Sequence, residues 1–214
     1  MFVDMHCHTT RSMDGFLAPA DAVQEAQQLG LGAVCFTEHD QLWSADEIAE
    51  IRQEHAFPVL RGVEVFTEIG HVLAFGLDSF DFALRSFPRL ADACADAGGA
   101  LVLAHPYRRF YRMTTSMPSD ADVTRALRRK GWDSIDAIEI WNGETRYAEN
   151  LLAAAVAERL LLPTTGGSDA HRVGELARTY TEVDDDIADE GDLVDAIRGR
   201  RIRGVASDRV KPTL

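Results

Sequence analysis

Lysine is nearly absent from this chain. Lys130 and Lys211 are the only lysines among 22 basic residues, and 35 acidic residues give a formal net charge of −13. Because phosphate backbones reward positive charge, this balance argues against general binding to double-stranded nucleic acid. Net charge bears on solubility and partners rather than on the fold. Salt adaptation and a biased genome both remain open as explanations of the preference for arginine.

Cysteine and long apolar runs are also scarce. Cys7, Cys35 and Cys94 are odd in number and widely spaced, without a CxxC pair, which argues against a disulfide scaffold. The most apolar stretch, LLAAAVAERLLLP, is interrupted by Glu158 and Arg159, so no run approaches the roughly 20 residues of a membrane span. The start, MFVDMHCH, lacks the basic and apolar regions of a secretory signal. We therefore expect a cytoplasmic protein with no membrane partner.

Short apolar segments alternate with amphipathic ones along the 214 residues. The pattern predicts helices with Pro19 in a first turn and with Ser44 and Glu47 as a capping box. Strands that alternate with helices are typical of a parallel sheet covered on both faces, so we expect one α/β domain over residues 1–214. The segments predicted as strands are FVDMHCH, LGAVCFTEHD, FPVLRGVEVFT with a hairpin partner HVLAFGL, ALVLAHP, IDAIEIWN, LPTTGGSDAH and YTEVD.

The seven histidines are placed unusually. Only His55, at a helix end, needs no special role. A lone histidine is more often structural than functional, but strand ends are where α/β folds place their chemistry. Six histidines at such positions, beside acids, therefore indicate a metal site. The predicted strand ends carry His6, His8, His39, His71, His105 and His171, together with Asp14, Glu64 and Asp169.

Spacing supports this interpretation. Side chains alternate across a strand, so His6 and His8 share one face while Cys7 packs on the other. Asp169 and His171 repeat the same arrangement in GGSDAH. Nitrogen and oxygen ligands without thiolate suit zinc, manganese or ferrous iron. Nine candidate ligands are too many for one ion and indicate a cluster.

The series DMHCHTTRSMDG, FTEHD, GVEVF, GHVLAFG, LAHPYR and GGSDAH resembles the polymerase and histidinol phosphatase (PHP) family of metal-dependent phosphoesterases. The resemblance implies a distorted (β/α)7 TIM-like barrel with a trinuclear metal centre of two to three divalent ions. It also implies the ligand sets. The first ion would take His6, His8, Glu64 and Asp169; the second Asp14, His39 and His171; and the third Glu64 as a bridge with His71 and His105.

An amidohydrolase is the competing interpretation, because that family also begins with an H-x-H strand. Many of its binuclear members bridge their ions with a carboxylated lysine at a strand end. Lys130 belongs to a predicted helix end and Lys211 to the tail, so neither lysine fits. Glu64 is the available bridge, and we favour the PHP resemblance.

The expected chemistry follows from charge. Three divalent ions outweigh three carboxylates, so the site would attract phosphate and lower the pKa of a bridging water toward about 7. A metal-activated hydroxide would then attack phosphorus, with Asp169 or a histidine beside the ligands as candidates for passing the proton. We expect hydrolysis of a small phosphate monoester or nucleotide. The alternatives are an exonuclease or phosphodiesterase acting on short single-stranded nucleic acid and, less favoured, a non-catalytic metal-binding PHP module.

Substrate recognition is predicted in the loop HPYRRFYRMTTSMP after His105. Arginine binds phosphate with a planar fork, and aromatic rings stack on bases or sugars. Arg108 is our candidate phosphate clamp, although a surface loop with solvated arginines explains the pattern equally well. The loop interleaves Arg108, Arg109 and Arg112 with Tyr107, Phe110 and Tyr111, and Trp141 and Asn142 at another strand end are further candidates for the pocket wall.

Overall fold

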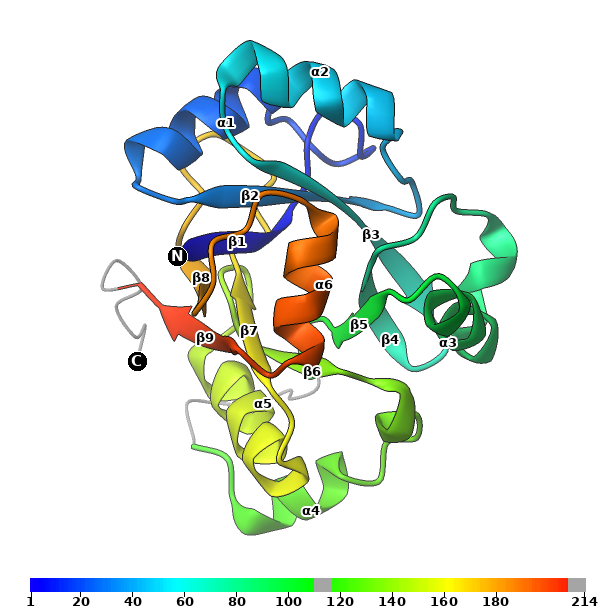
Figure 1. Ribbon diagram of the computed structural model, residues 1–214. Helices are drawn as coiled ribbons and strands as arrows, with labels where there is room; N and C mark the ends of the chain where they lie inside the picture. The colour runs from blue at the N-terminus through cyan, green and yellow to red at the C-terminus, as the bar shows by residue number, and fades with distance from the viewer. Residues whose placement is uncertain (110–116, 208–214) are drawn as a thin grey trace.

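The computed structural model describes residues 1–109 and 117–207. Within them, one mixed sheet of nine strands has the order β7-β6-β5-β4-β3-β2-β1-β8-β9 and curls into a nearly closed barrel (Figure 1). The strands are β1 (Phe2–Cys7), β2 (Ala33–His39), β3 (Val59–Thr67), β4 (Gly70–Phe75), β5 (Ala100–Leu103), β6 (Ala137–Asn142), β7 (Thr164–Gly167), β8 (Thr179–Val183) and β9 (Ile202–Ala206).

The expected α/β barrel is confirmed, but its sheet is mixed rather than parallel. Strands β1 to β3 are parallel, and so are β5 to β7. The predicted hairpin partner, β4, runs antiparallel to both β3 and β5. Strand β8 runs antiparallel to β1 and to β9, and α6 connects β8 to β9. A tight turn can reverse β4, because no helix has to cross between β3 and β4.

The segment after β7 closes the barrel against β1. The backbone N–H of Asp169 donates to the His6 carbonyl at 2.7 Å, and the N–H of His8 donates to the Ala170 carbonyl at 2.9 Å. An isolated parallel bridge joins Cys7 to Ala170. Two segments more than 150 residues apart in the chain are thereby aligned, with their polar side chains at one end of the barrel.

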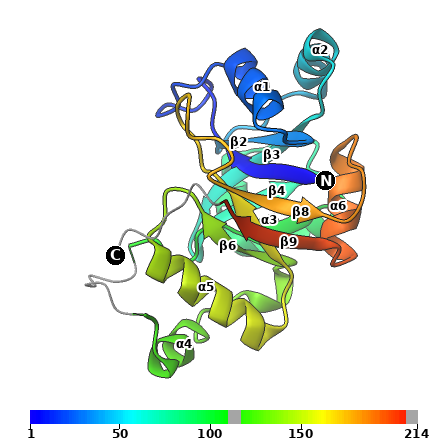
Figure 2. The same ribbon diagram turned by 90° about the vertical axis from the view of Figure 1, so that its left-hand side faces the viewer.

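Six α-helices in the described ranges cover the barrel. Helices α1 and α2 lie at one side and α4 and α5 at the opposite side (Figure 2). The capping box of Ser44 and Glu47 and the place of Pro19 at a helix start are confirmed. Cys7 is buried in a cluster with residues of α1, as its strand position predicts. The helices are α1 (Pro19–Gln28), α2 (Ala45–His55), α3 (Phe87–Asp96), α4 (Asp120–Ala126), α5 (Tyr147–Leu160) and α6 (Glu190–Arg198), with short 3-10 turns η1 (Phe82–Arg85) and η2 (Trp132–Ser134).

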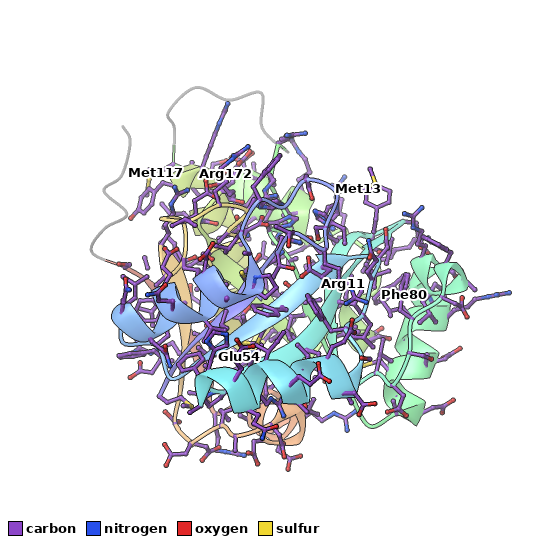
Figure 3. The ribbon with its side chains drawn as sticks, turned by 90° about the horizontal axis from the view of Figure 1, so that it is seen from above. Arg11, Met13, Glu54, Phe80, Met117 and Arg172 are labelled. Carbon is purple, nitrogen blue, oxygen red and sulfur yellow. The ribbon has the colours of Figure 1, made fainter. Side chains whose placement is uncertain are left out.

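The two ends of the barrel differ in polarity, and helix α6 covers the apolar end. Its buried face, which includes Leu193 and Ile197, packs with Val3 and Met5 of β1 in one hydrophobic cluster. Seen from above, Met13 and Arg172 lie on the side of the molecule away from α6 (Figure 3). One end of the barrel is therefore sealed by apolar packing, and the polar strand ends face the other. None of the helices in the described ranges is long and apolar enough to cross a membrane.

Strand β9 was not expected from the sequence, because IRGVA is short and its neighbours are polar. It pairs with β8, and Gly204 approaches β7 closely: a Cβ at this position would lie 2.3 Å from the Thr165 carbonyl oxygen. Backbone cannot move aside as a flexible side chain can. Glycine at position 204 is thus required for β9, paired with β8, to pack closely against β7.

We predict that Gly204→Ala lowers the free energy of unfolding by about 1–3 kcal/mol, the usual cost of overpacking. Gly191→Ala is the matched control, since Gly191 is exposed in α6 and its Cβ would meet only the Asp189 side chain, at 3.2 Å. That variant should be neutral or slightly stabilising, because alanine favours helix over glycine. Urea denaturation followed by circular dichroism measures both, and equal stability of the two variants would contradict the packing argument.

Candidate metal centre

The predicted ligands come from different strands that end on the same side of the barrel. His6 lies in β1, His39 ends β2 and Glu64 lies in β3. His71 is near the start of β4, which is the same end because β4 is antiparallel to β3 and pairs His71 with Phe66. Barrel geometry therefore explains why one histidine opens a strand while the others close theirs.

Glu64 is the centre of the arrangement. Its side chain is only 1% exposed, and its two carboxylate oxygens face a ring of imidazoles. Oε1 lies 2.6 Å from His71 Nδ1 and 2.8 Å from His105 Nε2. Oε2 faces the other side of the ring, at 2.9 Å from Nδ1 of His39, 3.2 Å from Nε2 of His8 and 3.4 Å from Nε2 of His6.

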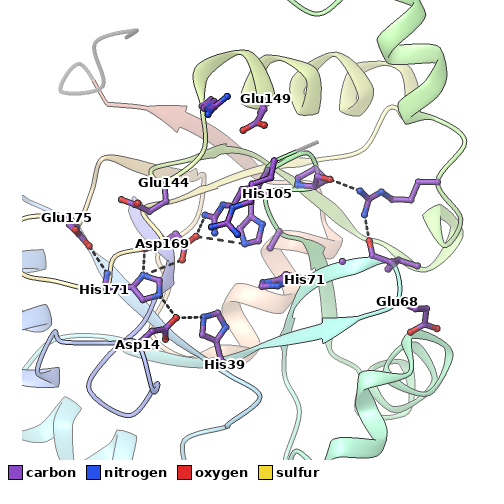
Figure 4. Close-up of a pocket in the computed structure, with 18 of the residues that line it drawn as sticks. Asp14, His39, Glu68, His71, His105, Glu144, Glu149, Asp169, His171 and Glu175 are labelled. Atoms are coloured by element: carbon purple, nitrogen blue, oxygen red, sulfur yellow. Dashed lines mark hydrogen bonds and ion pairs between the residues drawn. The ribbon is translucent and has the colours of Figure 1, made fainter. Parts of the chain in front are cut away.

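Two aspartates extend the cluster in opposite directions. Asp169, also 1% exposed, places Oδ1 3.2 Å from His8 Nε2 and 3.5 Å from His6 Nε2. Asp14 is more exposed and lies at the mouth, with Oδ2 3.4 Å from His39 Nε2 and 3.5 Å from His171 Nε2 (Figure 4). All nine residues predicted as ligands are thus brought into one continuous cluster.

Four overlapping groups in this cluster could each hold an ion, since their ligand atoms lie within 4.8 Å of one another. Glu64 Oε2 is buried and accepts no hydrogen bond in the described part of the chain. A buried polar atom without a partner is costly, and a divalent cation would satisfy it. The residues therefore fit a metal centre. The groups are His8, His39 and His171; His6, Glu64 and His105; His6, His8 and Asp169; and His39, Glu64 and His71.

Protonation of the metal-free cluster reflects burial and charge together. Burial alone would raise the pKa of Glu64, but the charge of His6, a hydrogen bond from His105 and the adjacent His39 ring hold it well below its usual value. Burial opposes the positive charge on His8, yet the adjacent carboxylates of Asp169 and Glu64 raise its pKa to about 9. For His105 burial dominates, and its pKa is lowered. The lowered pKa values of Glu64 and Asp169 keep these two carboxylates ionised, and the cluster holds protons that a cation would displace.

Two site residues have strained backbones. His105 has φ 25° and Asp169 has φ 56°. Non-glycine residues seldom adopt positive φ, and such strain gathers at functional sites where the surrounding structure imposes it. The hydrogen bond from the Asp169 N–H to the His6 carbonyl is one such constraint. The strain turns both side chains toward the cluster at the points where β5 and β7 end.

Arg108 is tied to the cluster itself. Its Nη2 hydrogen-bonds Asp169 Oδ2 and donates to Asn142 Oδ1 at 2.7 Å, while its Nε donates to Thr145 Oγ1 at 3.2 Å. Asp169 Oδ1 remains facing the histidines. Asn142, which the sequence suggested for the pocket wall, is buried and also donates from Nδ2 to Asp169 and Glu139.

Two buried glutamates were not singled out from the sequence. Glu139 in β6 accepts hydrogen bonds from His6 Nδ1 at 3.0 Å and from the His105 backbone N–H at 2.8 Å. Glu38 in β2 accepts from Ser12 Oγ at 2.6 Å, in the loop that leads to Asp14. For Glu139, a charged residue in the middle of an otherwise apolar strand was the available signal. Such a residue stays buried only if it has partners.

The other residues considered in the sequence analysis lie outside the cluster or outside the described residues. His55 ends α2, where its carbonyl accepts a bond from Gln27, outside the cluster. Trp141 stacks on Tyr147 with ring centroids 5.7 Å apart. Phe110, Tyr111 and Arg112 of the arginine–aromatic loop lie outside the described residues.

A large open cavity lies over the cluster. Its volume is about 1690 Å³, above the roughly 300–1,000 Å³ of ordinary small-molecule sites. Six basic side chains line it together with six acidic ones, among them Asp14 and Asp169 of the cluster. The basic side chains belong to Arg108, Arg109, Arg129, Lys130, Arg146 and Arg172.

Comparison with known proteins gives three kinds of match. A family model described as PHP-associated matches residues 148–202. A 5'-3' exoribonuclease from Haemophilus influenzae is 34% identical over 64 residues, covering 30% of this chain and 23% of that protein. A 3',5'-nucleoside bisphosphate phosphatase from Chromobacterium violaceum is 30% identical over 88 residues, covering 39% of this chain and 30% of that protein. The chain thus matches less than a third of the length of these curated relatives.

Among solved structures, a two-domain protein from Bacteroides vulgatus that contains a predicted PHP-like metal-dependent phosphoesterase has a TM-score of 0.68 at 21% identity, covering 96% of this chain and 64% of that one. These matches confirm the resemblance to the PHP family. An amidohydrolase from Chromobacterium violaceum has a TM-score of 0.63 at 17% identity, covering 98% of this chain and 99% of that one. At such identities both likenesses concern the barrel fold. The donor set separates the two interpretations, because Glu64 occupies the centre and Lys130 follows α4 rather than a strand.

We predict two to three divalent ions per chain by elemental analysis of gently purified protein. His39→Ala should reduce the metal content, since His39 belongs to two of the candidate groups. His55→Gln is the matched control and should leave the metal content unchanged. Equal loss from both variants would mean that the histidines at the strand ends are not the ligands.

We also predict that metal binding near neutral pH releases at least one proton. His8 has a pKa of about 9 in the metal-free protein, so it is protonated below that pH and must lose the proton before it can bind a cation. Apparent affinity should rise with pH toward about 9. Calorimetric titration with zinc in two buffers of different ionisation enthalpy counts the protons, and a count of zero would contradict this account.

Proposed function

We propose that the chain is a metal-dependent phosphoesterase that hydrolyses a small phosphate monoester or a nucleotide. The observation that carries the proposal is the buried carboxylate of Glu64, surrounded by imidazoles that include His39 and His105 in the lining of an open cavity. Divalent cations bound there would polarise a phosphate ester and supply an activated water for attack on phosphorus. The nine residues of the cluster are the proposed ligands. The PHP-associated match and the PHP barrel support the same class of reaction.

Asp169 and Arg108 are the proposed catalytic residues. Arg108 holds Asp169 Oδ2, which leaves Oδ1 facing His6 and His8. Charge from His6, a hydrogen bond from His8 and the Arg108 guanidinium keep the pKa of Asp169 well below its usual value, although burial opposes this. As an ionised group, Asp169 can accept a proton from the attacking water but cannot donate one. Arg108 also lines the cavity, so its guanidinium charge lies where a substrate phosphate would bind.

A nuclease acting on short single strands is the second candidate. The size of the cavity and its six cationic side chains favour it, because single-stranded nucleic acid is bound by basic grooves that follow the backbone. The partial likeness to an exoribonuclease points the same way. In either case the substrate is phosphorylated and small or short. A non-catalytic metal-binding module is the remaining alternative.

One screen separates these candidates. Phosphate release is measured from a panel of monoesters, diesters and short oligonucleotides with added manganese, zinc or ferrous iron. The phosphatase proposal expects turnover of monoesters, the nuclease proposal expects shortening of oligonucleotides, and a silent module gives neither. His39→Ala, purified identically, controls for contaminating phosphatases. Metal-bound protein with no turnover of any phosphate ester would overturn the proposed function.

We predict that Arg108→Ala lowers kcat/KM. The loss should correspond to about 1.5–3 kcal/mol of transition-state stabilisation, the usual range for hydrogen bonds to charged groups. Lysine at the same position should restore only part of the loss, because a point charge does not replace a planar fork. The matched control is Arg159→Ala, since Arg159 is 59% exposed and pairs with Asp120 outside the cavity lining. Unchanged monoester hydrolysis by Arg108→Ala would move the phosphate clamp to another cavity arginine.

A further inference from the structure

Glu139 is a buried carboxylate behind the proposed metal ligands. It lies in the middle of β6 and is only 1% exposed. Its two oxygens have different partners. Oε1 lies 3.0 Å from His6 Nδ1. Oε2 accepts hydrogen bonds from the His105 backbone N–H at 2.8 Å and from Asn142 Nδ2 at 3.0 Å. The residue therefore touches two proposed ligand segments from the side away from the cluster.

The contact with His6 constrains which ring nitrogen carries a hydrogen. An ionised carboxylate only accepts hydrogen bonds, so its neighbour Nδ1 has to be the donor. In the neutral ring the other nitrogen, Nε2, then presents a lone pair. That nitrogen is the one aimed at the cluster, 3.4 Å from Glu64 Oε2 and 3.5 Å from Asp169 Oδ1. Only this tautomer can bind a cation there.

Packing holds the pair in place. His6 is fully buried, and β7 passes directly beside it. A Cβ on Gly167 would lie 2.3 Å from His6 Cβ and 2.9 Å from Glu139 Oε1. There is no room for a side chain at position 167, so the β7 backbone packs directly against His6 and against Glu139 Oε1.

We propose that Glu139 is a positioning residue that fixes the His6 ring with Nδ1 protonated and Nε2 free to bind a divalent cation. The inference rests on the proposed metal centre and goes beyond it, because Glu139 is not one of the ligands. A carboxylate behind a ligating histidine orients the ring and strengthens the donor, and its loss commonly weakens metal binding by about 10–100-fold.

Glu139→Gln is the sharpest variant, because it keeps the shape and changes the hydrogen-bond capacity. Glutamine has one accepting oxygen and one donating amide group. The His105 N–H and Asn142 Nδ2 both require an acceptor, and Asn142 cannot reverse its amide because its Oδ1 already accepts from Arg108 and the Glu144 N–H. The glutamine NH₂ is then left facing His6 Nδ1, which favours the wrong tautomer.

We expect Glu139→Gln to bind zinc about 10–100-fold more weakly in competition with a chelator, and to retain fewer ions per chain. Glu149→Gln is the matched control: Glu149 is also a buried glutamate, 4% exposed, in the wall of the same cavity, but it contacts no histidine in the described residues. Its zinc affinity should equal that of the parent. Equal affinity of Glu139→Gln and the parent would overturn the inference.

A second measurement does not depend on how well the variant folds. In the zinc-bound parent labelled with ¹⁵N-histidine, long-range ¹H–¹⁵N spectra should show a proton on His6 Nδ1 and a metal-shifted Nε2. A proton on Nε2 would overturn the inference. The two proposals also fail separately: a parent that binds no divalent ion refutes the metal centre, whereas a parent that binds zinc without hydrolysing phosphate esters refutes only the proposed function.

Discussion

The constraint on which the site depends is the burial of one carboxylate among five imidazoles. Glu64 is almost fully enclosed, and its Oε2 lacks a hydrogen-bond donor. A buried charge of this kind is tolerated only when it is paired. In the metal-free protein, protons on the histidines supply that pairing, which is why the pKa of His8 rises while that of Glu64 falls. A cation replaces protons as the counter-charge, so metal binding, proton release and stability of the strand ends are coupled.

The barrel exists in a form that makes this cluster possible. Apolar packing beneath α6 seals one end, and the segment after β7 is hydrogen-bonded to β1 at the other. That closure sets Asp169 beside His6, and it depends on Gly167, where any side chain would collide with the Cβ and backbone N of His6. The strained backbones of His105 and Asp169 also serve the cluster, since regular strand geometry would direct these side chains elsewhere.

Residues around the ligands keep the ligand side chains in position through hydrogen bonds. Glu139 orients His6, Glu38 holds Ser12 in the loop before Asp14, and Arg108 occupies the outer oxygen of Asp169. Their hydrogen bonds are as short as those within the cluster, which means that the ligand positions are set before any ion arrives. Preorganisation of this kind is what distinguishes a metal centre from a chance gathering of acids and histidines.

The sequence by itself determined the class of fold and the membership of the cluster. Alternating apolar and amphipathic segments predict an α/β domain, and the resemblance to the PHP family implies the barrel. Histidines and acids at strand ends predict the ligands, because the carboxyl ends of neighbouring parallel strands lie on the same side of a sheet. Only the tertiary structure decided that β4 runs antiparallel and that β9 exists. It also decided that Glu139 of β6 faces His6 of β1, although these strands are far apart in the chain. These features depend on long-range pairing and close approach. Local periodicity carries no information about which distant strand becomes a neighbour, so a buried glutamate in β6 acquires its meaning only when the barrel closes.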